Sequence, residues 1–303
     1  MDQAERLREM VRKKSDEMAG AVTTRKDISR ISGRGPWVVS VTSGKGGVGK
    51  TNIVGNLAVT FQRKGKNVLV FDADLGLANI DIIFGIHPED NIDAVIRGEK
   101  KLSDIIVKGP EGVSVIPASS GIEEMASLTE GQKLNLLCEF DDLHQQFDIM
   151  LVDTGAGISS NVVYFNMAAQ KRLVVVTPEP TSITDAYALL KVMYHRYRTK
   201  EFFILMNMVE DEKEGKAVFK KLSQVVDKFL MGISLDYAGS ILRDDYLKQA
   251  VVKQQPVVCA FPRAVASRNM DVLADRLLRR MANSDPADGN IKFFWKRLVE
   301  KTV

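Results

Sequence analysis

The chain has 303 residues, of which 45% are hydrophobic and 27% are charged, and its net charge is +3. This composition is typical of a soluble globular protein, and the length is enough for one large α/β domain or two small ones. The weak charge gives no argument for nucleic acid, and the distant Cys138 and Cys259 argue against a disulfide framework or a zinc site.

The N-terminal residues 1–35 have a pattern of their own. They are charged from residue 2, which argues against a secretory signal, and no run in the chain approaches the ~20 apolar residues of a membrane-spanning helix. Ala4, Leu7, Met10 and Val11 recur at helical spacing among basic residues, and a polar stretch with small residues follows. We expect a short amphipathic helix on a flexible tether, with a solvated basic tail as the alternative.

Apolar runs alternate with helical patterns over residues 36–282, which we expect to form one domain. The expected strands are 36–43, 67–74, 112–118, 147–153, 172–178 and 202–207, and helical stretches include 51–65, 185–198 and 215–230. This alternation predicts an α/β fold with a doubly wound, mainly parallel sheet flanked by helices. Ligands bind at the carboxyl ends of such strands, where Lys50, Asp72, Asp74 and Asp153 gather.

The C-terminal residues are expected to form a linker and an amphipathic helix. Residues 283–290 have the composition of a linker, and residues 291–303 follow. A helical wheel gathers apolar side chains on one face and most of the charged ones on the other; the apolar face contains Ile291, Phe294, Trp295, Leu298, Val299 and Val303. Aromatic residues on an apolar face beside basic ones are typical of a helix at a membrane surface. The alternative is a last helix packed on the domain.

Residues 44–51, GKGGVGKT, match the pattern G-x-x-x-x-G-K-[ST] between an expected strand and an expected helix. In this pattern backbone N–H groups surround phosphate oxygens, the lysine reaches the β- and γ-phosphates, and the hydroxyl residue holds Mg²⁺. Lys50 and Thr51 take these two roles. The expected nucleotide-binding residues of this loop are Gly44, Lys45, Gly46, Gly47, Val48, Gly49, Lys50, Thr51 and Asn52.

The second lysine of the loop, Lys45, carries a resemblance to a known family. KGGVGKT resembles the deviant Walker A motif of the MinD/ParA ATPases, in which the early lysine reaches the nucleotide of a partner subunit. The resemblance implies that the chain forms a homodimer with ATP, and that Lys45 acts on the partner's nucleotide while Lys50 acts on its own. A cation supplied in this way can stabilise the transferring phosphoryl group as an arginine finger does. A solvated Lys45 is the alternative.

Two further segments are similar to the switch regions of that family. They are FDADLGLANIDIIFG at 71–85 and LVDTGAG at 151–157. The resemblance implies that Asp72 and Asp153 lie at the Mg²⁺ ion with Thr51, and that Asp74 orients the attacking water. For each aspartate alone, an ordinary cap or turn is the alternative.

Two other positions carry expectations from the same resemblance. Many relatives have D-x-P-A-G in the second switch, whereas this chain has Thr154 and Gly155, and the glycine is expected to loosen that segment. Asn207 would read the adenine edge, because its amide offers both a donor and an acceptor. A turn residue is the alternative for Asn207.

The N-terminal sequence DQAERLR at 2–8 resembles the DQAxxLR element of the flagellar-number regulators of the FlhG family, also called YlxH or FleN. In that family the N-terminal helix binds and activates the GTPase FlhF, so the resemblance implies an FlhF-type partner. The implied contact residues are Asp2, Gln3, Ala4, Leu7 and Arg8. Gln3 would position water in the partner's GTPase site, and flagellar switch-ring proteins are a further class of partner.

Taken together, the resemblance implies an ATPase that uses ATP and Mg²⁺ and releases ADP. It would dimerise with ATP at the inner face of the cytoplasmic membrane and regulate flagellar number and placement. The implied lipid-contact residues are Ile291, Phe294, Trp295, Leu298 and Val299.

Four other functions are alternatives for a chain with this loop. A MinD-type cell-division regulator is the nearest, but MinD starts almost directly at its first strand. A ParA-type DNA partition ATPase fits the weak charge poorly, so no specific nucleic acid is expected. The nitrogenase iron-protein branch needs a cysteine pair that this sequence lacks. A scaffold without ATPase activity would result if Asp74 were misplaced.

Overall fold

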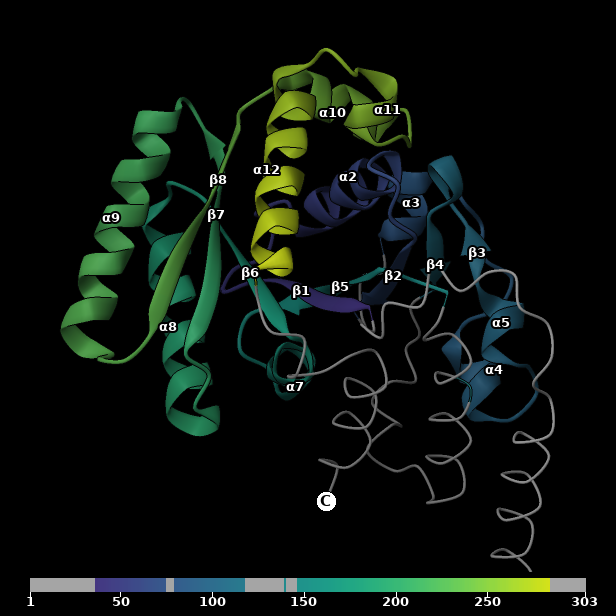
Figure 1. Cartoon of the computed structure of the whole chain (residues 1–303), viewed down its shortest axis with the longest axis horizontal. Helices are drawn as coiled ribbons and strands as arrows, with labels where there is room; N and C mark the ends of the chain where they lie inside the picture. The colour runs from purple at the N-terminus through teal and green to yellow at the C-terminus, as the bar shows by residue number, and fades with distance from the viewer. Residues whose placement is uncertain (1–35, 75–78, 118–138, 140–145, 284–303) are drawn as a thin grey trace, which may run out of the picture. The chain divides into compact units, whose positions relative to one another are not determined.

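A mixed sheet of eight strands organises the described part of the chain, with the strand order β3-β4-β2-β5-β1-β6-β7-β8 (Figure 1). The computed structural model describes residues 36–74, 79–117, 139 and 146–283. The strands are β1 Trp37–Ser43, β2 Val68–Ala73, β3 Val107–Lys108, β4 Ser114–Ile116, β5 Ile149–Ala156, β6 Lys171–Val176, β7 Glu201–Val209 and β8 Ser234–Leu242. All neighbouring pairs are parallel except β3 and β4.

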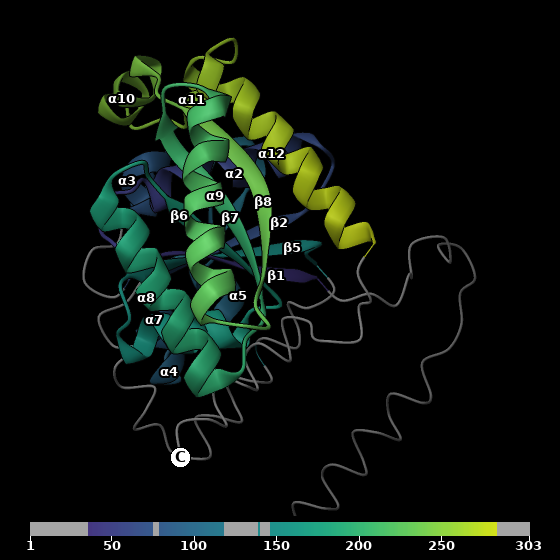
Figure 2. The same cartoon turned by 90° about the vertical axis from the view of Figure 1, so that its left-hand side faces the viewer.

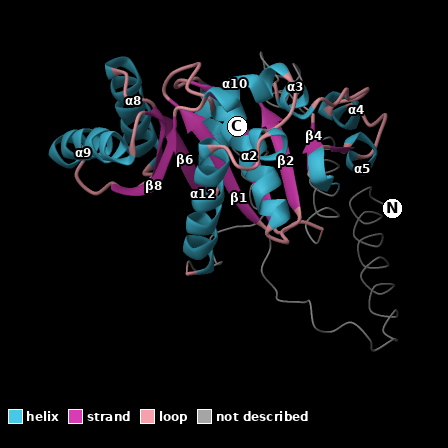
Figure 3. Cartoon of the chain, turned by 90° about the horizontal axis from the view of Figure 1, so that it is seen from above, coloured by secondary structure: helices cyan, strands magenta, loops and turns pink. Residues whose placement is uncertain are grey.

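Helices cover both faces of this sheet, as expected for a parallel sheet whose strands are apolar on both sides (Figure 3). They are α2 Lys50–Arg63, α3 Ile80–Phe84, α4 Ile92–Ile96, α5 Leu102–Ile105, α7 Ser160–Ala168, α8 Pro180–Tyr197, α9 Glu212–Phe229, α10 Asp245–Val252, α11 Val257–Ala260 and α12 Val265–Ala282, with the 3₁₀ helix η1 at Pro110–Gly112. One core joins α2, α3, α11 and α12 to one face. The other face carries α4, α5 and α7 over one part and α8 and α9 over another.

The edge strand β8 lies between α9 and α12 (Figure 2). Helix α12 runs antiparallel to it and covers part of its outer rim with side chains. Arg276 Nη1 donates to the Ala238 carbonyl at 2.8 Å, and Asn269 Oδ1 accepts the Leu242 N–H at 3.1 Å. Two of the backbone groups that β8 turns away from β7 therefore find partners on α12.

The six strands expected from the apolar runs are all present, and the prediction of a mainly parallel, doubly wound sheet is confirmed. Strand β8 was not expected, because its sequence SLDYAGSIL is interrupted by Asp236 and Gly239. The amphipathic helices expected within 1–35 and 291–303 lie outside the described residues, so the domain boundaries stay predictions. Within the described residues, no helix is long and apolar enough to cross a membrane.

Candidate nucleotide-binding site

The loop between β1 and α2 has the backbone shape that a phosphate-binding loop requires. Gly47 and Gly49 have φ values of +76° and +89°, a region that side-chain-bearing residues rarely adopt. A Cβ on Gly44 would lie 2.1 Å from the backbone carbonyl carbon of Asp185, so only glycine lets the loop approach the start of α8. Helix α2 thus begins at the end of the loop, and its first backbone N–H groups have no partner within the helix, so they can bind an anion.

Strand register brings the two buried carboxylates together beside this loop. Asp72 on β2 lies opposite Asp153 on β5, and Asp153 in turn lies opposite Val41 near the end of β1. Both carboxyl groups are almost inaccessible to solvent, and Lys50 is also buried. The carboxyl ends of three adjacent strands therefore place two acids and one lysine at one point, as the sequence predicted.

Asp153 is buried without a satisfied hydrogen bond. Neither carboxylate oxygen has a partner of acceptable geometry among the described residues. Burial, and then the charge of Asp72, raise the pKa of Asp153 to about 8, while the nearby Thr51 hydroxyl and Lys50 ammonium act in the opposite direction. A buried carboxylate with open lone pairs costs free energy unless a cation or donor completes it, so this side chain fits a metal ion.

The composition of this site favours Mg²⁺ over metals that need many protein ligands. No group of three or more His, Cys, Asp or Glu side chains within the described residues could hold a metal ion by itself. Mg²⁺ is usually bound through one or two carboxylates, with waters and substrate phosphates as its other ligands. Thr51, Asp153 and Asp72 match that pattern.

Asp72 also fixes the start of helix α3. Its carboxylate accepts the backbone N–H groups of Asp74 at 3.2 Å and of Asn79 and Ile80 at 3.3 Å. Burial raises the pKa of Asp72 to about 6, although these three hydrogen bonds act against the shift. A change in the ligands of Asp72 would therefore reach the first switch segment through its backbone.

Asp74 lies at the end of β2 and faces Gly155 across the site. A Cβ on Gly155 would stand 3.2 Å from Asp74 Oδ1 and 3.4 Å from Val162 Cγ2, which is tighter than ordinary contact. Gly155 lies inside β5, and the preceding Thr154 donates its hydroxyl to the Val41 carbonyl at 3.1 Å. The glycine therefore makes room for Asp74. The pairing of β5 with β1 is irregular at Thr154 and Gly155, and the expected loosening of this segment stays a prediction.

Lys45 is engaged within its own chain. Its Nζ lies 2.5 Å from Glu179 Oε2 and 3.1 Å from Thr181 Oγ1, at the start of α8. Both partners of this ion pair are substantially solvent-exposed, so the contact is weak and exchangeable. The action of Lys45 on a partner's nucleotide stays a prediction, with a solvated Lys45 as its alternative. No sequence pattern predicted this contact between Lys45 and Glu179.

Asn207 supports the loop from β7. Its Nδ2 donates to the Val48 carbonyl at 2.7 Å, and a Cβ on Gly49 would lie 2.7 Å from the same nitrogen. The side chain is buried, and the next residue, Met208, has a φ of +58°. Asn207 is thus at the site, as predicted, and one half of its amide holds the loop. Its contact with adenine stays a prediction.

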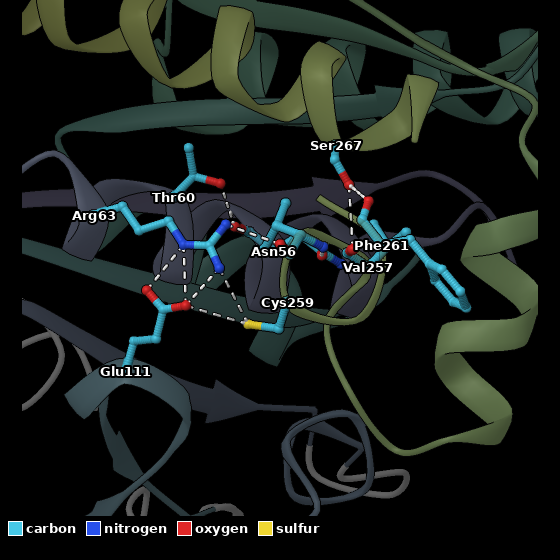
Figure 4. Close-up of polar contacts among 9 residues, drawn as sticks. Asn56, Thr60, Arg63, Glu111, Val257, Cys259, Phe261 and Ser267 are labelled. Carbon is cyan, nitrogen blue, oxygen red and sulfur yellow. Dashed lines mark hydrogen bonds and ion pairs between the residues drawn. The ribbon is translucent and has the colours of Figure 1, made fainter. Parts of the chain in front are cut away.

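A polar network fixes α2 from its opposite end (Figure 4). Asn56 Oδ1 accepts the Val258 N–H at 3.1 Å, and Arg63 Nη1 donates to the Val258 carbonyl at 2.8 Å. Arg63 also pairs with Glu111 in η1 at 2.5 Å. Burial first, and then the charge of Glu111, raise the pKa of the adjacent Cys259 thiol to about 11, so it is a poor nucleophile at neutral pH. The network is structural and joins the phosphate-loop helix to α11.

The structure brings together most of the predicted site residues. Residues 44–52, Asp72, Asp74, Asp153 and Asn207 all lie around the carboxyl ends of β1, β2, β5 and β7. The predicted partner-binding residues, Asp2, Gln3, Ala4, Leu7 and Arg8, lie outside the described residues. So do the predicted membrane residues, Ile291, Phe294, Trp295, Leu298 and Val299.

The fold and the loop define a class of protein, and comparison with known proteins agrees. The family model described as "AAA domain" (AAA_31) matches residues 37–203. The cell-division ATPase MinD of Pyrococcus furiosus superposes with a TM-score of 0.66 at 22% identity, covering 80% of this chain and 99% of that structure, which shows a shared fold. The chain belongs to the MinD/ParA family of P-loop ATPases with a deviant Walker A motif.

Two of its relatives within that family are flagellar proteins. The antiactivator FleN of Pseudomonas aeruginosa is 43% identical over 263 residues, covering 87% of this chain and 93% of FleN. The flagellum site-determining protein YlxH of Helicobacter pylori is 37% identical over 265 residues, covering 86% of this chain and 89% of YlxH. The predicted resemblance to the FlhG (YlxH/FleN) branch is confirmed.

Proposed function

We propose that the chain is a Mg²⁺-dependent ATPase that works as a molecular switch regulating flagellar number and placement. The observation that carries the enzymatic part is Asp153, a buried carboxylate beside the phosphate loop whose oxygens have no hydrogen-bond partner of acceptable geometry among the described residues. A MinD from Pyrococcus horikoshii with the same fold is described as complexed with Mg-ADP, which supports the choice of ligands. The flagellar part is supported by the names of FleN and YlxH, relatives over most of the chain.

The site residues divide the work of phosphoryl transfer. Backbone N–H groups of the loop and Lys50 bind the phosphates, while Thr51 and Asp153 hold the metal with Asp72 beside them. Mg²⁺, when bound, neutralises the charge that develops on the phosphate oxygens. Asp74 lies at the end of β2, where it can hold the attacking water in line.

Lys45 supplies the link between hydrolysis and dimerisation. Its contact with Glu179 is exposed, so it can be exchanged for a phosphate of a partner subunit when two chains meet. A cation that arrives only with the partner makes ATP hydrolysis depend on dimerisation. The homodimer forms with ATP and separates after hydrolysis.

The two chain ends connect this switch to its surroundings. Helix 291–303 binds the inner face of the cytoplasmic membrane, and pairing two copies in the dimer strengthens that binding by avidity. The N-terminal helix, with Gln3, stimulates an FlhF-type GTPase, and switch-ring proteins of the flagellum are further partners.

The decisive experiment combines two turnover measurements. The full chain should hydrolyse ATP only with Mg²⁺, and turnover at background level would contradict the enzymatic proposal. A synthetic peptide of residues 1–20 should stimulate the GTPase of an FlhF-type protein, with a Gln3→Ala peptide as control. No stimulation by either peptide would remove the flagellar GTPase from the proposal and favour a MinD-like cell-division role.

A further inference from the structure

A surface with apolar and basic side chains lies at the ends of α8 and α9, far from the phosphate loop. Its apolar members are Tyr197, Val225, Phe229 and Met231, and its basic members are Arg196, Arg198, Lys200 and Lys228; we call this set the α8–α9 tip. Met231 is 81% exposed and Phe229 is 59% exposed, which is unusual for large apolar side chains. The tip stands at the amino ends of β7 and β8, opposite the edge that carries the nucleotide site.

Backbone contacts make the tip one continuous surface. The Tyr194 hydroxyl, in the last turn of α8, donates to the Met231 carbonyl at 2.6 Å. The Ser234 N–H donates to the Lys200 carbonyl at 2.7 Å, which joins the start of β8 to the turn before β7. The turn after α9 is therefore fixed against the end of α8, with the Met231 side chain facing outward.

The four basic side chains of the tip outnumber the two exposed acidic side chains beside them, Asp227 and Glu201, and this excess of positive charge suits an anionic lipid surface. Among the described residues, Arg196, Arg198, Lys200 and Lys228 form no ion pair, and all four are exposed. Lys228 lies over the Phe229 ring, 5.1 Å from its centroid. Long basic side chains around protruding aromatic and thioether groups can insert the apolar parts while the charges stay at lipid headgroups.

Arg198 occupies a backbone position that glycine would fill at lower cost. It follows the last residue of α8 with a φ of +59° and a ψ of +24°. Helices commonly end on a residue in this left-handed conformation, and that residue is usually glycine. An arginine held there keeps a charge at the tip in spite of the backbone strain, which points to a use for the side chain.

The C-terminal segment leaves the fold from the same edge of the sheet. Arg280, near the end of α12, pairs with Asp236 near the start of β8 at 2.7 Å. Helix α12 ends at Ala282, and the eight residues 283–290 can span at most about 28 Å when extended. The predicted membrane helix 291–303 is therefore tethered within reach of the plane in which the tip lies.

We propose that the α8–α9 tip is a second contact between this chain and an anionic lipid bilayer. It rests on the membrane association proposed above and deepens it, because it assigns a lipid-binding role to the folded domain itself. Helix 291–303 anchors the chain, and the tip orients the domain with its amino edge toward the lipid.

The test is sedimentation of the full-length chain with ATP and vesicles that contain phosphatidylglycerol. Arg198→Gly should weaken binding roughly fivefold, the value of one basic residue near a charged membrane. The same variant should melt no earlier than the wild type, because glycine adopts this backbone without strain. Lys228→Gln should also weaken binding roughly fivefold, since it removes one positive charge. The matched control is Lys216→Gln on the same helix, about 18 Å away, and it should change little.

The outcomes separate the tip from the anchor. If both tip variants bind the vesicles as well as the wild type does, the proposed lipid contact at the tip is refuted. The same holds if Lys216→Gln loses as much binding as Lys228→Gln. In either case the proposal for helix 291–303 is unaffected. If the full-length chain with ATP binds no vesicle, membrane association fails and the tip fails with it. Weaker binding of the tip variants to these vesicles, with equal binding to pure phosphatidylcholine, supports the proposal.

Discussion

Replacing Asp153 by asparagine should stabilise the folded chain when neither metal nor nucleotide is bound. Burial and the neighbouring Asp72 raise the pKa of the Asp153 carboxyl to about 8, whereas in the unfolded chain it titrates near ~3.9. Because the folded-state pKa is the higher one, the folded chain binds more protons. Its stability therefore falls as the pH rises from about 4 toward about 8, and it levels off above that.

The size of this effect follows from the pKa difference. At about 1.4 kcal/mol per unit, ionisation favours the unfolded chain by up to about 4 kcal/mol at pH 7 and about 2 kcal/mol at pH 5. Asparagine has no ionised form, so the variant avoids this cost. The stability gap between variant and wild type should therefore be larger at pH 7 than at pH 5.

The assay is urea unfolding in the presence of a metal chelator, followed by fluorescence between about pH 5 and pH 8. The matched control is Asp148→Asn, an exposed aspartate just before the same strand. Its Oδ2 accepts the Asn67 N–H at 2.8 Å, a hydrogen bond that the asparagine oxygen can keep, so stability should shift by less than about 0.5 kcal/mol. A less stable Asp153→Asn, or a gap that does not change with pH, would refute the reasoning. Mg²⁺ with ADP should stabilise the wild type more than the variant, which keeps the phosphate loop but lacks the carboxylate expected at the metal.

Three other changes test the site and the ends. Asp74→Ala should block hydrolysis and trap an ATP-bound dimer; size-exclusion chromatography that shows only monomer with ATP would contradict this. Deleting 291–303 should abolish vesicle binding and leave ATP hydrolysis intact, and continued sedimentation with vesicles would contradict it. Gly155→Ala should lower ATP turnover roughly tenfold with little change in nucleotide affinity, because its Cβ displaces Asp74 by a few tenths of an ångström; unchanged turnover would show that Asp74 tolerates the shift.

The sequence was enough to predict six of the eight strands of the sheet and the phosphate loop. Each expected strand is a short apolar run followed by a turn or a helical pattern, and parallel topology then fixes where the strands end. Asp72 and Asp153 could be placed together because each ends such a run and the carboxyl ends of parallel strands share one edge. The period of the apolar residues and the rules of parallel topology were enough to predict these features.

The rest depends on distances between segments far apart in sequence. The position of Gly155 against Asp74 and the contact of Lys45 with Glu179 follow from packing between elements, which no local pattern encodes. Strand β8 was missed because a glycine with a φ of +134° and a polar residue interrupt its apolar run, and its pairing with β7 supplies what its own sequence lacks. These features could be seen only in the three-dimensional structure.

The two edge strands of the sheet affect whether copies of this chain can aggregate by adding strand to strand. One rim is β3, which has only two residues, and the other is β8, whose outward backbone groups are partly occupied by Arg276 and Asn269. A long row of unpaired backbone groups invites open-ended strand addition. Within the described residues, the shortness of β3 and the side chains of α12 over β8 both oppose it, so the two rims favour association between copies through side chains or bound ligands.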